Sequence, residues 1–249
     1  MSRILWETSF HLALVHSGKF NNKVANHLFR WVCLSGNEKD LETSDKIAAD
    51  VINELMQKAP AKPYQQYKDN YKWIVQAGEN KLVVGSQARI LYSDIEGRMK
   101  IALEFNKAIK EGRISGPIAL SRDHHDVSGA DSPFRETSNI YDGSNITADM
   151  STHTFAGNAI RGATWCALHN GGGTGFGLAI NCGFGLVLDG SEDAENRSQQ
   201  VLFWDVSNGI ARRSWSGNDN ANETILRAME LNPGLVVTVA QACDEEINL

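Results

Sequence analysis

A cluster of titratable side chains, RDHHD, occupies residues 122–126. Two adjacent histidines between carboxylates suit proton transfer, because a neighbouring carboxylate raises the pKa of a histidine and fixes its tautomer. One of the two histidines is expected to be structural rather than functional. A metal site is the weaker interpretation, because adjacent histidines on a strand cannot both face one ion and no HExxH spacing follows. We therefore expect no metal.

A second candidate segment is ALHNGGGTGFG at residues 167–177. Its glycines do not fit GxGxxG in any frame, and no Lys-Ser/Thr ending marks a phosphate-binding loop. Glycines without Cβ atoms allow a flat ligand or a phosphate to lie against the backbone, near free N–H groups. The alternative is a glycine-rich turn or a close contact between strands, and the residues alone leave both open.

Two arginines stand in apolar or turn-forming surroundings, Arg30 in LFRWV and Arg135 in SPFRET. An arginine in such a setting usually has an anionic partner. That partner is either the carboxylate of a ligand or an internal protein carboxylate, and the two interpretations carry about equal weight.

The elements that position these residues are predicted to alternate between helices and short apolar strands. This alternation favours an α/β architecture. Helical periodicity predicts helices at 41–56, with Thr43 or Ser44 as the N-cap, and at 67–77, 99–110, 192–204 and 218–231. Short strands are predicted at 81–85, 116–120 and 164–168, and the prolines of 59–63 predict a break. Both candidate segments follow a predicted strand, where ligands gather in α/β sheets.

Composition narrows the function classes. With a net charge of -6 over 249 residues, the chain lacks the basic surface of a nucleic-acid-coating protein. No apolar run reaches the length of a membrane span, and the first ten residues lack the apolar core of a signal peptide. The four cysteines form no CxxC pair, so we expect reduced thiols and a cytoplasmic protein.

Five stretches together resemble urocanase, closest to its longer animal-type branch. They are FRWVCLSG at 29–36, VVGSQARI at 83–90, SRDHHDVSGADSPFRETSNIYDGS at 121–144, RGATWCALHNGGGTGFG at 161–177 and WDVSNGIARRSW at 204–215. The resemblance runs in one register through these long motifs, which makes chance similarity a poor explanation.

The resemblance implies a urocanate hydratase, a hydro-lyase of histidine degradation that adds water to urocanate to give 4-imidazolone-5-propanoate, with NAD+ as the electrophile. It also implies a homodimer. Arg30 matches the family's substrate-carboxylate arginine, and Arg135 and His169 are assigned to substrate binding with it. Asp123, His124 and Asp126 are assigned to proton handling, and Gly171, Gly172 and Gly173 to NAD+. No nucleic-acid or membrane partner is implied.

The chain also departs from the family. It resembles only the C-terminal part, roughly the last two-fifths, without the Rossmann NAD domain, and Leu91 stands where shorter bacterial urocanases place a catalytic cysteine. We expect residues 1–28 to be a remnant of the preceding segment and residues 29–249 to be the C-terminal urocanase-like domain, an α/β fold of short strands and helices. Three hypotheses remain: a fragment of the enzyme, a non-catalytic protein that binds a small acid or a partner, and a half-enzyme completed in trans.

Overall fold

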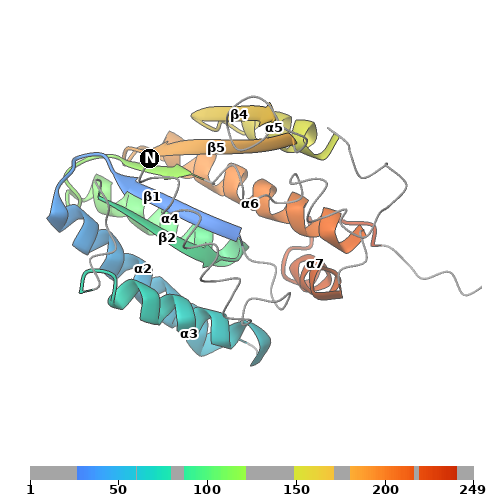
Figure 1. The fold of residues 1–249 in the computed structure, drawn as a ribbon, viewed down its shortest axis with the longest axis horizontal. Coiled ribbons are helices and arrows are strands. Elements are labelled where there is room, and N and C mark those ends of the chain that lie inside the picture. Colours follow the sequence, from blue (N-terminus) through green and yellow to red (C-terminus); the bar gives the residue numbers. More distant parts are fainter. Residues whose placement is uncertain are drawn as a thin grey trace, which may run out of the picture.

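The computed structural model describes residues 27–59, 61–79, 87–121, 149–170, 180–215 and 219–239. Helices pack on a five-stranded sheet, so the predicted α/β class is confirmed (Figure 1). The strands are β1 (His27–Cys33), β2 (Ala88–Ser93), β3 (Ile118–Ser121), β4 (Trp165–Asn170) and β5 (Ile180–Leu188). The helices are α2 (Glu38–Lys58), α3 (Ala61–Val75), α4 (Ile95–Lys110), α5 (Asp149–Ile160), α6 (Glu192–Trp215) and α7 (Asp219–Leu231).

The sheet has the strand order β2-β1-β3-β5-β4, and each neighbouring pair is antiparallel. The alternation of helices and strands would more commonly give a parallel sheet. Strands β3 and β4 are nevertheless parallel to each other, because both are antiparallel to the β5 strand between them. They therefore end at the same edge of the sheet, and β2 ends there too because it is antiparallel to β1.

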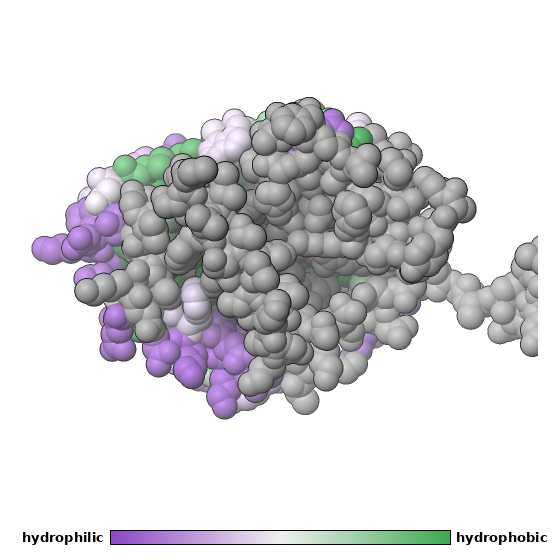
Figure 2. All heavy atoms as spheres, in the orientation of Figure 1, coloured by the Kyte–Doolittle hydropathy of each residue, from purple (hydrophilic) through white to green (hydrophobic). Residues whose placement is uncertain are grey.

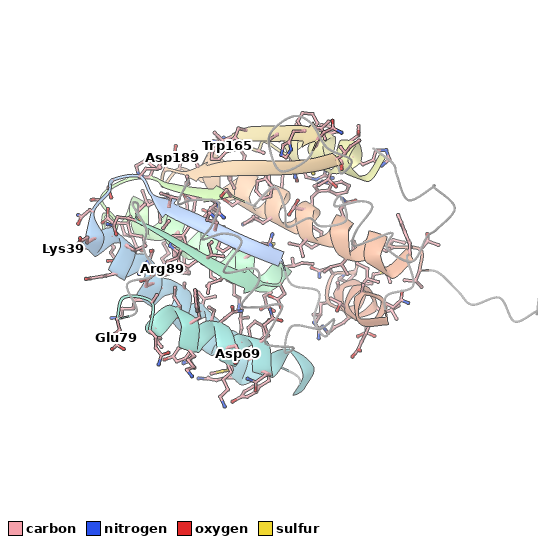
Figure 3. The ribbon with its side chains drawn as sticks, viewed as in Figure 1. Lys39, Asp69, Glu79, Arg89, Trp165 and Asp189 are labelled. Carbon is pink, nitrogen blue, oxygen red and sulfur yellow. The ribbon has the colours of Figure 1, made fainter. Side chains whose placement is uncertain are left out.

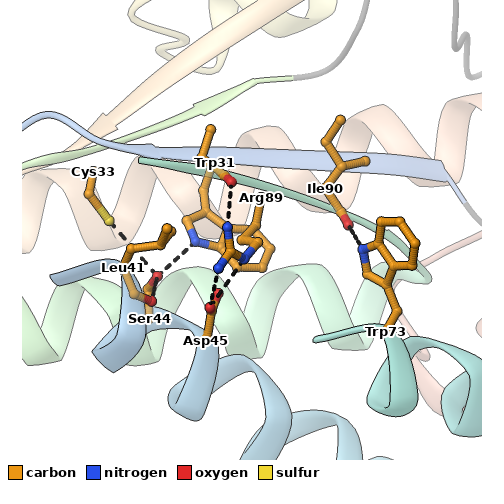
Figure 4. Close-up of polar contacts among 9 residues, drawn as sticks. Trp31, Cys33, Leu41, Ser44, Asp45, Trp73, Arg89 and Ile90 are labelled. Atoms are coloured by element: carbon orange, nitrogen blue, oxygen red, sulfur yellow. Dashed lines mark hydrogen bonds and ion pairs between the residues drawn. The ribbon is translucent and has the colours of Figure 1, made fainter. Parts of the chain in front are cut away.

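One face of the sheet forms the core with α2 and α4. Phe29, Trp31 and Cys33 alternate along β1, and each is at most 2% exposed. The Trp31 indole donates a 2.9 Å hydrogen bond to Ser44 of α2, and its ring lies 5.3 Å from the ring of Phe105 on α4. Figure 4 shows this contact beside the ion pair between Arg89 of β2 and Asp45 of α2, 2.7 Å apart. These contacts attach β1 to α2 and α4, and β2 to α2.

The long helices were predicted correctly, and so were the end of α4 at Lys110, the start of α6 at Glu192 and the end of α7 at Leu231; the other ends were not. Helix α2 begins with Asn37 as its N-cap, whose side chain accepts a hydrogen bond from the Lys39 N–H. The predicted caps were wrong: Thr43 and Ser44 lie inside the helix, and Ser44 is buried against Trp31. Pro63 does not keep the chain out of helix, because it stands in the first turn of α3, where no intrahelical N–H bond is needed.

Other elements differ in extent or were not predicted. Helix α6 continues to Trp215, and α7 begins at Asp219 and packs on it through Val206, Ile210 and Ile225. Strands β1, β2 and β5 and helix α5 had no predicted counterpart. The strand predicted at residues 81–85 lies outside the described residues.

Charged side chains mark the outer side of the molecule along α2 and α3. Lys39 on α2 and Asp69 on α3 are exposed, as is Glu79 beyond the end of α3, and Figure 3 shows them on the margin of the molecule. The hydrophilic colour in Figure 2 gathers at the lower left, over this same region. In the described residues, no helix is long and apolar enough to cross a membrane.

Candidate functional site

Two of the predicted site residues, Arg30 and His169, belong to the described part of the chain. Asp123, His124, Asp126, Arg135 and the glycines Gly171, Gly172 and Gly173 lie outside the described residues. The geometry of the candidate site is therefore built from Arg30, His169 and the elements that flank the two candidate segments.

Arg30 is half-buried on β1, between Phe29 and Trp31. Because successive strand side chains point to opposite faces and its neighbours point at the helices, Arg30 belongs to the opposite face of the sheet. We call this side of the sheet the Arg30 face. Arg30 pairs with Ser121, the last residue of β3, so it stands beside the residue that leads into the RDHHD segment.

His169 lies on the same face but in a different row. Arg30 pairs with Ser121, Ser121 with Gly185 and Gly185 with Trp165, and cross-strand partners share a face. His169 is four residues further along β4 and therefore also belongs to the Arg30 face. Strand spacing and rise place its backbone roughly 20 Å from that of Arg30. The structure thus puts the two residues on one face without bringing them into one contact.

The two candidate segments leave the sheet at the same edge. Residues 122–148 follow β3, and the glycine segment, residues 171–179, joins β4 to β5. At the start of α5, which follows the first segment, the Ser151 hydroxyl donates a 2.6 Å hydrogen bond to the carbonyl of Ile180, which follows the second. Ser121, the residue before RDHHD, therefore lies beside Arg30, and Ser151, near the start of α5, lies beside the first residue of β5.

Helix α5 is attached through a polar face. Ser151, Thr154 and Asn158 are each at most 1% exposed. Thr154 accepts a 2.8 Å hydrogen bond from Asn208, and Asn158 donates one of 3.2 Å to Asp205, both on α6. In turn, Asp205 forms a buried ion pair with Arg98 of α4, with 3.5 Å between Oδ2 and Nη1.

Sequence reasoning gave Asp205 and Asn208 no role, although both lie in the quoted WDVSNG motif. They are three residues apart, which places them on one side of α6, next to the buried apolar residues Val206 and Ile210. The helical spacing of these two polar residues was the available signal.

Trp165 is the other residue that sequence reasoning did not single out. Trp165 is 45% exposed although its indole lies directly over Gly185, where an added Cβ would overlap the ring atoms Cζ2, Cε2 and Cη2. Gly185 is its cross-strand partner, so the ring leans from β4 across β5 on the Arg30 face. Figure 3 labels Trp165 on β4 at the margin of the sheet.

Asp94, the carboxylate that directly follows β2, has a structural role. Burial raises the pKa of Asp94, which accepts hydrogen bonds from the Tyr67 hydroxyl and the Gly97 N–H as the N-cap of α4. Within the described ranges, no group of three His, Cys, Asp or Glu residues could hold a metal ion. Cys33, Cys166 and Cys182 are free thiols.

A family model described as the urocanase C-terminal domain matches residues 23–227. That range is most of the chain and contains all five strands. The chain belongs to the urocanase C-terminal domain family. The resemblance found in the sequence is confirmed, and Arg30, the two candidate segments and α5 all lie within the urocanase domain.

Curated relatives of this urocanase domain agree on the family. The chain is 59% identical over 221 residues to a probable urocanate hydratase of Dictyostelium discoideum and 58% identical over 220 residues to one of Caenorhabditis elegans. It is 57% identical over 221 residues to the urocanate hydratase of Mus musculus. Each alignment covers 88% of this chain but 33% of the relative. The chain thus spans about a third of the length of these relatives, slightly less than the two-fifths expected.

Proposed function

We propose that this chain forms the substrate side of a urocanate hydratase, which adds water to urocanate to give 4-imidazolone-5-propanoate in histidine degradation. The observation that carries the proposal is its identity of 57–59% to urocanate hydratases over 88% of its length. The position of Arg30 beside Ser121 supports it, because a cation then stands at the base of the segment that holds the proposed proton-transfer groups.

The roles of the residues follow from their chemistry. Arg30 and Arg135 pair with the carboxylate of urocanate, since a guanidinium offers two parallel donors to a carboxylate. Asp123, His124 and Asp126 hold and move the protons that water addition requires, since an imidazole between carboxylates titrates near neutral pH. His169, at the end of β4, orients the substrate from the side of the glycine segment.

NAD+ is the cofactor of the proposed reaction. A run of residues without Cβ atoms leaves room for the flat nicotinamide ring. In the sequence this run follows β4, which ends at the same edge of the sheet as β3. Gly171, Gly172 and Gly173 would hold the ring through their backbone. When bound, NAD+ supplies an electron-accepting cationic ring for the conjugated imidazole of urocanate.

The chain covers a third of its relatives, and we propose that it does not turn over urocanate by itself. The purified 249-residue protein with NAD+ is expected to leave the ultraviolet absorption of urocanate unchanged. Clear loss of that absorption would contradict this part of the proposal. We also propose that the chain forms a homodimer, which size-exclusion chromatography with light scattering would test.

A chimera tests the function itself. Residues 23–227 of this chain replace the aligned stretch of the Mus musculus urocanate hydratase, and the loss of urocanate absorption is followed. The chimera is expected to be active. Arg30→Ala should raise its KM for urocanate by about tenfold to a hundredfold, because a charged hydrogen-bond pair is lost. The matched control is Arg113→Ala, because Arg113 is exposed. An inactive but folded chimera, or an unchanged KM in Arg30→Ala, would refute the assignment.

A further inference from the structure

Trp165 is exposed where a structural tryptophan would be covered. The core tryptophan Trp31 is fully buried, with its N–H bonded to Ser44, whereas Trp165 leaves 45% of its surface open. Its ring lies over Gly185, a position without a side chain. A tryptophan that only covered a glycine would gain most from burying its whole surface. The remaining open surface is aromatic.

The indole shares a row of the sheet with Arg30. The row runs Arg30, Ser121, Gly185, Trp165 across four strands, with all four positions on the Arg30 face. Arg30 and Gly185 are two strand spacings apart, roughly 10 Å between backbones. Because the Trp165 ring lies over Gly185, it extends from the edge strand towards Arg30, and Ser121 is the described residue of this row that stands between them.

This row offers a cation at one end and an aromatic face at the other. Such a pair is complementary to a small ligand that carries a carboxylate and a flat ring, since aromatic rings stack with a preference for offset geometry. Urocanate has this shape, with two carbons between its imidazole ring and its carboxylate. A ligand with a carboxylate alone would use only the Arg30 end.

We infer that Trp165 is a substrate-binding residue whose indole stacks against the imidazole ring of urocanate while Arg30 holds the carboxylate. The inference rests on the proposed function and extends it, because it assigns the recognition of the ring to a residue on β4. Gly185 contributes by its missing side chain, which leaves the space that the indole occupies.

The test is a binding titration on the 249-residue chain, with urocanate and with pent-2-enoate, an unsaturated acid that lacks the ring. Trp165→Leu should weaken urocanate binding by about threefold to tenfold, the usual contribution of a stacked aromatic pair, and leave pent-2-enoate binding unchanged. Trp165→Phe should retain most of the affinity. The matched control is Trp215→Leu on α6, because Trp215 is also exposed, at 52%. Thermal unfolding of each variant verifies that it is folded.

Gly185→Ala tests the same site without altering the tryptophan. Its Cβ would overlap the indole, so the ring must move, and urocanate affinity should fall while pent-2-enoate affinity stays. If the folded Trp165 and Gly185 variants bind urocanate as the wild type does, the inference is overturned and the proposed function stands. If the wild-type chain binds pent-2-enoate as tightly as urocanate, or binds neither, the inference is likewise overturned. The chimera described above then decides the proposed function separately.

Discussion

The hydroxyl of Ser151 on α5 is bonded to the carbonyl of Ile180, the first residue of β5, over a distance of 2.6 Å. Ile180 directly follows the candidate segment at residues 171–179. Ser151 is the third residue of α5, the helix that directly follows residues 122–148. One hydrogen bond thus joins α5 to β5 through residues that are 29 positions apart in the chain.

Replacing Ser151 by alanine should weaken this junction. The carbonyl of Ile180 loses its donor, and because Ser151 is buried, the free energy of unfolding should fall by about 1 kcal/mol. Urea denaturation measures the change. Thr152→Ala, at the exposed neighbouring position, is the control and should leave the stability almost unaltered. Equal effects of the two variants would argue against the junction.

Asp205→Ala should be far more damaging. It leaves the Arg98 guanidinium, which is fully buried, without its carboxylate, and breaking such a pair costs about 3–5 kcal/mol. It also removes the acceptor of Asn158 on α5. Denaturant unfolding would show the loss. Glu111→Ala breaks an exposed ion pair with Arg113 and should have little effect. A stability loss for Asp205→Ala no greater than that for Glu111→Ala would contradict this prediction.

Asp40 should make stability depend on pH in the acid range. Burial alone would raise its pKa, but hydrogen bonds from Ser115 and Ser35 outweigh burial and hold the pKa below its ordinary value. A lowered folded-state pKa stabilises the protein above the unfolded-state value near 3.8, and this stabilisation is lost as the pH falls through the folded-state pKa.

The variant Asp40→Asn isolates this effect. At neutral pH it should be less stable than the wild type by about 2 kcal/mol, since hydrogen bonds to a charged acceptor are replaced by neutral ones. The difference should shrink steadily below pH 4 as the wild-type carboxylate becomes protonated. Urea unfolding of both proteins between pH 2 and pH 8 would measure it, and a constant difference over that range would refute the assignment.

The described thiols should differ in reactivity. Burial raises the pKa of Cys33 to about 11, so it holds almost no thiolate at pH 8, and Cys182 is fully buried. Cys166 on β4 is partly exposed. In a Cys243→Ser background, Ellman's reagent should therefore modify one thiol quickly, with mass spectrometry locating it at Cys166. Rapid labelling of Cys33 in the native protein would be inconsistent with its packing against Ser44.

The sequence predicted the helices in which buried apolar residues recur with the helical period. Ile47, Val51 and Leu55 recur on one side of α2 and are buried as expected. Helix α5 was not predicted, because its buried residues Ser151 and Asn158 are polar. Their hydrogen-bond partners lie on β5 and α6, far along the chain. Strand β5 was not predicted because Gly183 and Gly185 interrupt its apolar pattern.

In the candidate site, too, one part could be predicted from the sequence and another could not. Arg30 was singled out because a cation amid apolar residues is conspicuous in any sequence, and its place beside Ser121 needed only the pairing of β1 with β3. The relation of Arg30 to Trp165 depends on the whole strand order, in which β4 is reached only through β5. No local pattern encodes that order, so the sequence could not indicate that Trp165 shares a row with Arg30.

The attachment of α5 has a consequence for how this region can evolve. Residues 122–148 start from a paired strand and finish at a helix that is bonded to α6, so both ends are held by contacts made elsewhere. Strand β3 and helix α5 therefore keep these contacts whatever the length of the sequence that connects them. Changes of sequence length between β3 and α5 are therefore compatible with the same scaffold of sheet and helices.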